Sequence, residues 1–141
     1  MYRILELNPQ LIPFSDNIDL RMNLYRNTKN RLLTAGQDLK DFANGHNFYG
    51  FHHVEGGWYY REWAPSADQL YLEGEFNNWN PTSHPMKRLD GENWELYLPG
   101  DDALWHGCKV KTVVDYHGSR TDHLPLYIRR VIQNKSNNPF D

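Results

Sequence analysis

The feature that most constrains this chain is a change in the spacing of its apolar residues near residue 45. Before this point, apolar side chains recur at spacings that fit the period of an α-helix. The residues of this stripe are Ile18, Met22, Tyr25, Leu32, Leu39 and Phe42. After residue 46 the period falls to two, which is typical of strands with one buried face. The sequence therefore predicts a helical segment followed by a β-domain.

The helical segment contains signals for more than one helix. Ser15 or Asp16 is a suitable N-cap for the main helix, because a short polar side chain can accept hydrogen bonds from first-turn N–H groups. Gly36 interrupts the helical pattern. Thr34 and Gln37 have the spacing of a capping box, so we expect a second short helix to begin there.

The second part of the chain contains six runs with a two-residue period, each bounded by residues typical of turns. These runs are residues 48–54, 58–63, 69–75, 93–98, 108–115 and 126–132. They follow one another without intervening helices, which favours an antiparallel sandwich. The predicted fold is mainly β: an immunoglobulin-like antiparallel β-sandwich preceded by a short helical segment. We expect a helical lead-in at residues 1–45, the sandwich at 46–133 and a linker at 134–141.

Composition excludes several classes of partner. The net charge of −3 leaves no basic excess to neutralise phosphates, so no nucleic-acid binding is expected. No apolar run approaches the ~18 residues of a transmembrane helix, so no membrane association is expected. The single cysteine, Cys108, fits a reducing compartment. We therefore expect a cytoplasmic protein.

One tryptophan lies in a polar turn in a chain whose aromatic content is 14%. Trp79 stands between Asn78 and Asn80 and is followed by Pro81. A flat ring among short amides suits a sugar, because the apolar CH faces of the sugar can stack on the ring while its hydroxyls bond to the amides. The alternative is a core tryptophan that happens to precede a turn, since this residue type is usually well buried.

No arrangement of reactive side chains in the sequence indicates catalysis. His52 and His53 are adjacent, so on a strand they point to opposite faces and cannot bind one metal ion as a pair. Cys108 is expected to be a small core residue. The carboxylates of Glu62, Glu73, Glu75 and Asp90 do not have a spacing that singles out an acid and a nucleophile. The sequence predicts no catalytic residue, no metal site and no cofactor.

Five blocks of sequence occur in an order that resembles a known family. They are Tyr60–Pro65, Leu72–Pro81, Trp94–Pro99, His106–Lys111 and Leu124–Arg130, and the block Phe42–Gly50 precedes them. In this order they resemble the amino-terminal region of 1,4-α-glucan (glycogen) branching enzymes of the eukaryotic style. The β-sandwich of that region belongs to carbohydrate-binding module family 48.

The resemblance implies a non-catalytic, α-glucan-binding portion of a larger enzyme. In this family the sandwich precedes a catalytic barrel of glycoside hydrolase family 13. The barrel cleaves an α-1,4 link and transfers the chain to a 6-hydroxyl, which makes the α-1,6 branches of glycogen. The implied partners are therefore α-1,4-glucan and the chain's own barrel, with residues 134–141 as the linker toward it.

The resemblance also implies particular site residues. Trp79 matches the tryptophan that stacks on glucan in related modules, and Asn78 lies beside it. Lys111 matches a lysine that bonds sugar in the glycogen-binding regulatory subunits of AMP-activated kinase. Those subunits carry a second tryptophan shortly after the lysine, where this chain has Tyr116 and His117 as possible substitutes.

A second candidate sugar-contacting patch is formed by Trp63 and Pro65, near the expected seam between sandwich and barrel. The alternative is that Trp63 is a core or interface residue. Two other functions remain open for the whole chain. One is a stand-alone glycogen-tethering or regulatory module, and the other is a structural spacer that binds no sugar.

Overall fold

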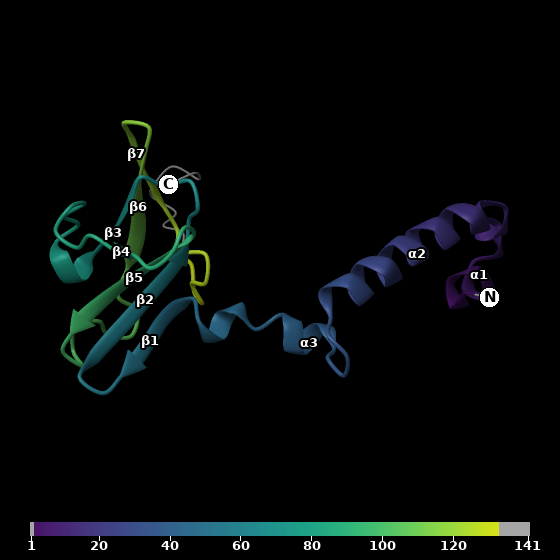
Figure 1. Ribbon diagram of the computed structural model, residues 1–141, viewed down its shortest axis with the longest axis horizontal. Coiled ribbons are helices and arrows are strands. Elements are labelled where there is room, and N and C mark those ends of the chain that lie inside the picture. Colours follow the sequence, from purple (N-terminus) through teal and green to yellow (C-terminus); the bar gives the residue numbers. More distant parts are fainter. Residues whose placement is uncertain (1, 133–141) are drawn as a thin grey trace. The chain divides into compact units, whose positions relative to one another are not determined.

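The computed structural model describes residues 2–132, so the predicted linker at 134–141 and the last residue of the predicted sandwich lie outside the described range. The chain divides into two compact units between Asn44 and Gly45. The first unit is helical, and the second contains all the strands of the described range (Figure 1).

The described part of the first unit contains α1 (Arg3–Leu7), the 3₁₀ helix η1 (Pro9–Phe14), α2 (Ser15–Leu32) and α3 (Leu39–Phe42). Phe14 occupies the N-cap of α2, and no side chain caps this helix. The predicted capping role of Ser15 or Asp16 is therefore wrong. The backbone N–H of Ser15 donates to the carbonyl of Ile12, so η1 itself supplies an acceptor that a capping side chain would otherwise provide.

The second short helix begins later than predicted. The Gln37 side chain does accept a hydrogen bond from the Thr34 N–H at 3.3 Å, but the chain only turns there. The helix α3 starts after Asp38, whose carboxylate accepts from the Asp41 N–H at 3.0 Å. The Asp41 carboxylate accepts from the Asp38 N–H at 2.9 Å in return. This reciprocal pair satisfies two backbone donors at once and fixes the start of the helix.

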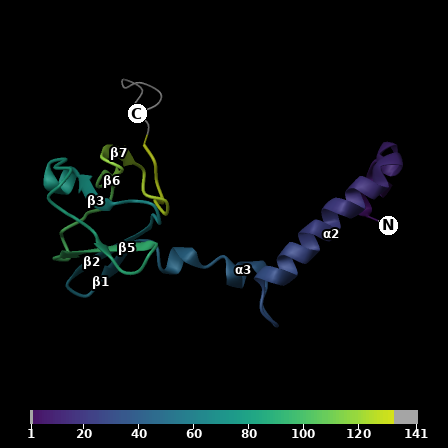
Figure 2. The same ribbon diagram turned by 45° about the horizontal axis from the view of Figure 1, so that its top comes forward.

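The second unit begins with the 3₁₀ helix η2 (Gly45–Asn47) and continues as a sandwich of two antiparallel sheets. Its strands are β1 (Gly50–Val54), β2 (Gly57–Trp63), β3 (Gln69–Gly74), β4 (Lys87–Arg88), β5 (Asn93–Pro99), β6 (Val110–Tyr116) and β7 (Ser119–His123). The order is β1-β2-β5-β4 in one sheet and β3-β6-β7 in the other. Figure 2 labels β1, β2 and β5 of the first sheet and all the strands of the second. This is the strand arrangement of a constant-type immunoglobulin domain, and it confirms the predicted fold class.

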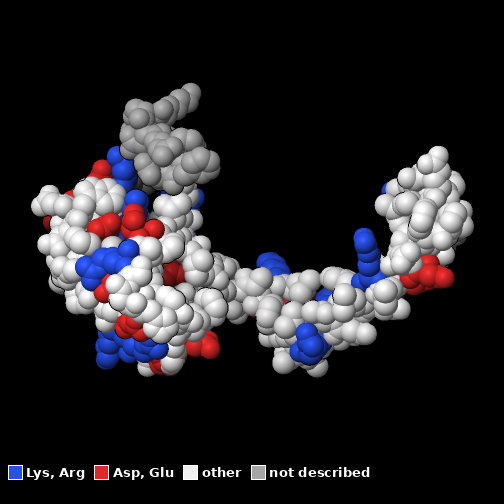
Figure 3. All heavy atoms as spheres, turned by 90° about the horizontal axis from the view of Figure 1, so that it is seen from above, with Lys and Arg blue, Asp and Glu red and all other residues white. Residues whose placement is uncertain are grey.

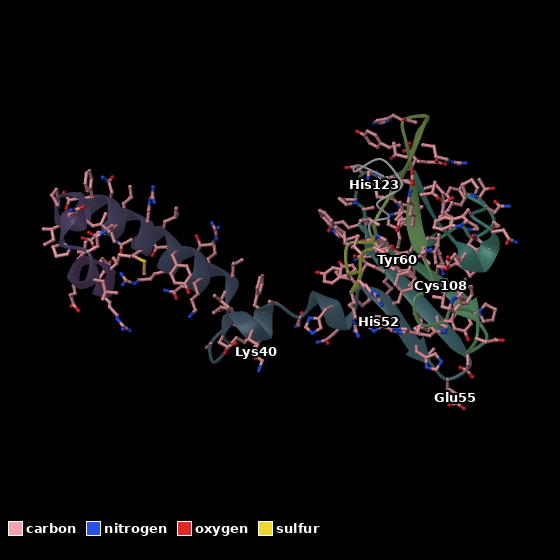
Figure 4. All side chains as sticks on the ribbon, turned by 180° about the vertical axis from the view of Figure 1, so that it is seen from behind. Lys40, His52, Glu55, Tyr60, Cys108 and His123 are labelled. Carbon is pink, nitrogen blue, oxygen red and sulfur yellow. The ribbon has the colours of Figure 1, made fainter. Side chains whose placement is uncertain are left out.

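Side chains from both sheets form one core between them. Tyr60 on β2 and Leu70 and Leu72 on β3 are completely buried, and Tyr60 is labelled in Figure 4. Trp94 on β5 is also buried, and its indole N–H donates to the carbonyl of Ala64 at 2.9 Å. Because strand side chains alternate, the residues between these ones point away from the core.

The last strand is not where the sequence placed it. Residues 126–132 form no strand, and β7 precedes them. The β6–β7 hairpin turns at His117 and Gly118, which both have positive φ, as in a two-residue hairpin. All side chains of β7 are exposed, so this strand lacks the apolar alternation on which the prediction relied. Apolar residues after β7 instead belong to an irregular exit segment (residues 124–132).

A buried carboxylate ties the exit segment to both sheets. Glu62 is 5% exposed and accepts from the Tyr60 hydroxyl at 2.6 Å and from the Leu126 N–H at 3.0 Å. Because the Tyr60 hydroxyl donates its one proton to Glu62, the Thr112 hydroxyl on β6 donates to Tyr60 at 2.6 Å. Burial, followed by the charge of Glu62, raises the pKa of Tyr60 well above its usual value. The network therefore keeps its protons at neutral pH.

Candidate carbohydrate-binding site

The turn that carries Trp79 follows β3 directly. A single 3₁₀ turn, η3 (Glu75–Asn77), leads to Asn78 and Trp79, which have φ values of 55° and 58°. Residues other than glycine rarely adopt this left-handed conformation, and for a bulky residue it costs free energy that surrounding contacts must offset. One such contact is the hydrogen bond from the Trp79 N–H to the Gly74 carbonyl, at 2.8 Å.

Asn77 is the residue that fixes this turn, and the sequence reasoning did not identify it. Its Oδ1 accepts from the Gly74 N–H at 2.9 Å, and its Nδ2 lies 3.1 Å from the Leu72 carbonyl. The same Nδ2 lies 3.0 Å from Ser83 Oγ and 3.1 Å from His84 Nδ1. One side chain thus connects the end of β3 to both sides of the turn. The bond from the Gly74 N–H to Asn77 is one half of a capping box, and the other half is missing because glycine has no side chain, so the sequence offered no complete signal for it.

Trp79 is 41% exposed, so it is not a core residue. Asn78 and Asn80 on either side are exposed as well. The Asn80 carboxamide oxygen accepts from the Thr82 N–H at 3.1 Å, which keeps the far side of the turn closed. The chain therefore presents a partly open indole on a turn whose backbone is fixed by hydrogen bonds.

Lys111 lies at the same end of the three-stranded sheet as this turn. It pairs in register with Glu73, one residue before the glycine that anchors Trp79. Its amine forms an ion pair with Asp122 on β7. Burial raises the pKa of Glu73, the nearby Asp122 raises it further and Lys111 lowers it. This end of the sheet therefore carries one cation, Lys111, and two carboxylates, Glu73 and Asp122.

The possible substitutes for the second tryptophan lie elsewhere. Tyr116 ends β6, and His117 follows it in the hairpin turn, with ring centroids 4.2 Å apart. Lys111 and Tyr116 are five residues apart on one strand, which corresponds to roughly 17 Å. The structure therefore does not bring Tyr116 or His117 together with the Trp79 turn.

Trp63 and Pro65 form a separate patch. Trp63 is the last residue of β2 and is 46% exposed, and its indole N–H donates to the Glu92 carboxylate at 3.2 Å. Pro65 is half-buried in the loop that leads to the start of β3. Trp79 follows the other end of β3, so roughly 17 Å of strand separates the two patches. Trp63 is thus not a core residue, and it does not share a site with Trp79.

No group of three or more His, Cys, Asp or Glu side chains within residues 2–132 could hold a metal ion. No helix of that range is long and apolar enough to span a membrane.

The order of the strands in the two sheets defines the second unit as an immunoglobulin-like β-sandwich. The sequence model of the family described as carbohydrate-binding module 48 (isoamylase N-terminal domain) matches residues 48–128, more than half of the chain. The chain belongs to this family.

Curated relatives are 1,4-alpha-glucan-branching enzymes. The enzyme of Dictyostelium discoideum is 36% identical over 99% of this chain and 21% of its own length. That of Felis catus is 38% identical over 79% of this chain and 17% of its own length. The 1,4-alpha-glucan-branching enzyme 2-2, chloroplastic/amyloplastic, of Arabidopsis thaliana is 32% identical over 99% of this chain and 18% of its own length. These matches confirm the resemblance, and the chain spans about a fifth of the length of these relatives.

Proposed function

We propose that this chain is the non-catalytic, α-glucan-binding portion of a 1,4-α-glucan branching enzyme, with Trp79 as its main contact with glucan. In this proposal Asn78 and Lys111 bond to sugar hydroxyls around the stacked ring, and Trp63 and Pro65 contact the glucan chain elsewhere. The names of the relatives and membership of the family support this reading.

The observation that carries the proposal is the partial exposure of Trp79 on a turn that hydrogen bonds hold in a rarely adopted conformation. A turn whose backbone is already fixed loses little freedom when a ligand stacks on the ring that it carries, so more of the stacking energy appears as affinity. Charged side chains of both signs lie next to one another on the face of this unit that Figure 3 shows, which suits a neutral ligand.

The catalytic steps belong, in this proposal, to a barrel in the remainder of a longer protein. This barrel would cleave the α-1,4 link and transfer the chain to a 6-hydroxyl. A cytoplasmic location is also part of the proposal, although one relative's name places that enzyme in plastids.

The proposal is tested by titrating the chain with maltoheptaose and following backbone amide shifts by NMR. One stacked ring contributes on the order of 1–3 kcal/mol, which corresponds to a millimolar site at best. We expect saturable shifts at Asn78, Trp79 and Lys111 with a dissociation constant in that range, and Trp79→Ala should abolish them.

Trp105→Ala is the matched control, since Trp105 is a similarly exposed indole, at 51%, on a different loop. It should leave the Trp79 shifts and the affinity unchanged. The absence of any shift at about 60 mM maltoheptaose, roughly tenfold above the ~6 mM that 3 kcal/mol corresponds to, would leave only the role of a structural spacer.

A further inference from the structure

The outward face of the four-stranded sheet carries a second set of aromatic and polar side chains. Strand pairing places Tyr59 on β2 opposite Tyr97 on β5, and Arg61 opposite Glu95. Tyr60 of β2 points into the core, so its neighbours Tyr59 and Arg61 point outward. The Tyr59 and Tyr97 rings are 5.0 Å apart between centroids. This set belongs to the other sheet from the one that carries the Trp79 turn.

Tyr97 lies over the backbone of the neighbouring strand because Gly57 has no side chain. A Cβ atom at Gly57 would lie 2.8 Å from the Tyr97 hydroxyl oxygen and 2.9 Å from the ring carbon that bears it. The hydroxyl donates to the Gly56 carbonyl at 2.9 Å, which fixes the ring. Tyr97 is nevertheless 42% exposed. One side of the ring therefore rests on the sheet, and the ring is still open to solvent.

Two charged side chains beside this ring, Arg61 and Glu95, form an ion pair with each other. Arg61 Nε donates to the Glu95 carboxylate at 2.6 Å, and both side chains are partly buried. The Arg61 guanidinium also lies over the rings of Phe48 and Tyr59, at 4.9 Å and 4.8 Å from their centroids. The ion pair places donors and acceptors beside the ring, and Lys87 of β4, which pairs in register with Glu95, adds a further donor on the same face. Such groups can bond to a ligand rich in hydroxyl groups.

We propose that the outward face of the four-stranded sheet is a second pyranose-binding surface, with Tyr97 as its stacking platform and Arg61 and Glu95 as partners for sugar hydroxyls. This inference rests on the proposed function, since it takes the ligand to be the same α-glucan. A pyranose ring has the apolar faces that a flat tyrosine accepts and the equatorial hydroxyls that a guanidinium–carboxylate pair can bond.

Two surfaces on different sheets have a consequence for binding to a polymer. A short oligosaccharide occupies each surface independently, whereas glycogen can engage both at once. The second contact is then intramolecular, and the apparent affinity for the polymer exceeds that of either surface alone.

The test uses maltoheptaose with the full 141-residue chain and follows amide shifts in three variants. In Trp79→Ala, we expect saturable shifts to persist at Tyr59, Arg61 and Tyr97. Adding Tyr97→Ala should raise the dissociation constant of these remaining shifts about tenfold, as the loss of one stacked ring predicts. Tyr97→Phe in the same background is the matched control, because it keeps the ring, and it should bind nearly as well as Trp79→Ala alone.

The outcomes separate this inference from the proposed function. If Trp79→Ala removes every shift, the second surface does not exist and the Trp79 site stands. If shifts occur at the Tyr97 face only, the second surface stands and the assignment of Trp79 falls. Intermolecular nuclear Overhauser contacts between maltoheptaose and the Tyr97 ring in the unsubstituted chain provide a check that needs no variant, and their absence at saturating sugar overturns the inference.

Discussion

At the scale of single residues, the Trp79 turn depends on one asparagine rather than on the tryptophan itself. Asn77 accepts from the Gly74 N–H and lies within hydrogen-bonding distance of acceptors on both sides of the turn. Asn77→Ala leaves the Gly74 N–H without this acceptor, so we expect unfolding free energy to fall by about 1–3 kcal/mol. Urea denaturation of the variant and the unsubstituted chain measures this difference.

Asn77→Asp is the informative control for this prediction. It keeps the acceptor for Gly74 but replaces the donating amide with a carboxylate, which cannot donate to the Leu72 carbonyl. It should therefore also destabilise the chain. If Asn77→Ala is as stable as the unsubstituted chain, the turn is held by its backbone bonds alone.

His84 should make this turn sensitive to pH. Burial lowers the pKa of His84 below its usual value, and its Nδ1 accepts from Asn77 Nδ2 at 3.1 Å in the neutral ring. The unfolded chain therefore binds a proton at His84 more readily than the folded chain, so the stability from the neutral ring is present above about pH 6.5 and is lost as the pH falls below that value.

The measurement is the unfolding free energy between about pH 7.5 and about pH 5 for the unsubstituted chain and His84→Asn. The unsubstituted chain should lose more stability over this interval, because the two proteins differ only at His84. Equal losses in the two proteins would show that His84 does not contribute.

Sequence and structure agree at this scale where local chemistry decides the outcome. The amides around Trp79 favoured an exposed ring but left a core tryptophan open as the alternative, and the structure decides for exposure at 41%. The position of the Tyr97 ring over Gly57 could not be predicted from neighbouring residues. It depends on which residues of β2 and β5 stand opposite each other, and the sequence alone does not give that register.

At the scale of elements, strands with a buried face were predicted and those without one were not. The runs that became β1, β2, β3, β5 and β6 alternate apolar and polar residues, and they lie within a few residues of their predicted bounds. The strands β4 and β7 have only exposed side chains, so pairing with a neighbour is what defines them. The prediction of a strand at residues 126–132 failed because these residues pair with no neighbouring strand, and Leu126, Val131 and Ile132 stay exposed in an irregular segment.

That exit segment is held by one aromatic side chain as well as by Glu62. The Tyr127 ring stacks on Tyr49 with centroids 5.3 Å apart, and a Cβ atom at Gly50 would lie 3.0 Å from Tyr127 Cβ. Tyr127→Ala removes the stack, so we expect a loss of about 0.5–1.5 kcal/mol beyond the loss of buried area. Amide hydrogen exchange at Tyr49 and Gly50 should become faster.

Tyr127→Phe keeps the ring and should retain the slow exchange. If Tyr127→Ala also leaves exchange at Tyr49 and Gly50 unchanged, the stack does not hold the exit segment, and the hydrogen bond to Glu62 is sufficient.

At the scale of the whole molecule, the helical unit differs from the sandwich in how little it buries. Leu24, Tyr25, Leu32 and Leu39 of the predicted stripe and its flank are exposed and line a shallow apolar groove. Exposed apolar patches of this kind promote association. We expect the chain to self-associate as its concentration rises, and Leu24→Lys to reduce this association in sedimentation velocity.

Asn27→Lys on the same helix is the control, since it adds the same charge at an exposed polar position. It should leave association nearly unchanged. Equal reduction by both variants would mean that added charge, rather than loss of the apolar contact, separates the molecules.

The Tyr49–Tyr127 stack also determines how the sandwich joins its surroundings. It places the stretch that leads into β1 against the stretch that leaves β7, so the polypeptide arrives and departs at one spot. A domain whose entering and leaving segments lie next to each other tolerates insertion into another protein. It can be spliced into a surface loop of an unrelated host, or excised from its own, without stretching the flanking backbone.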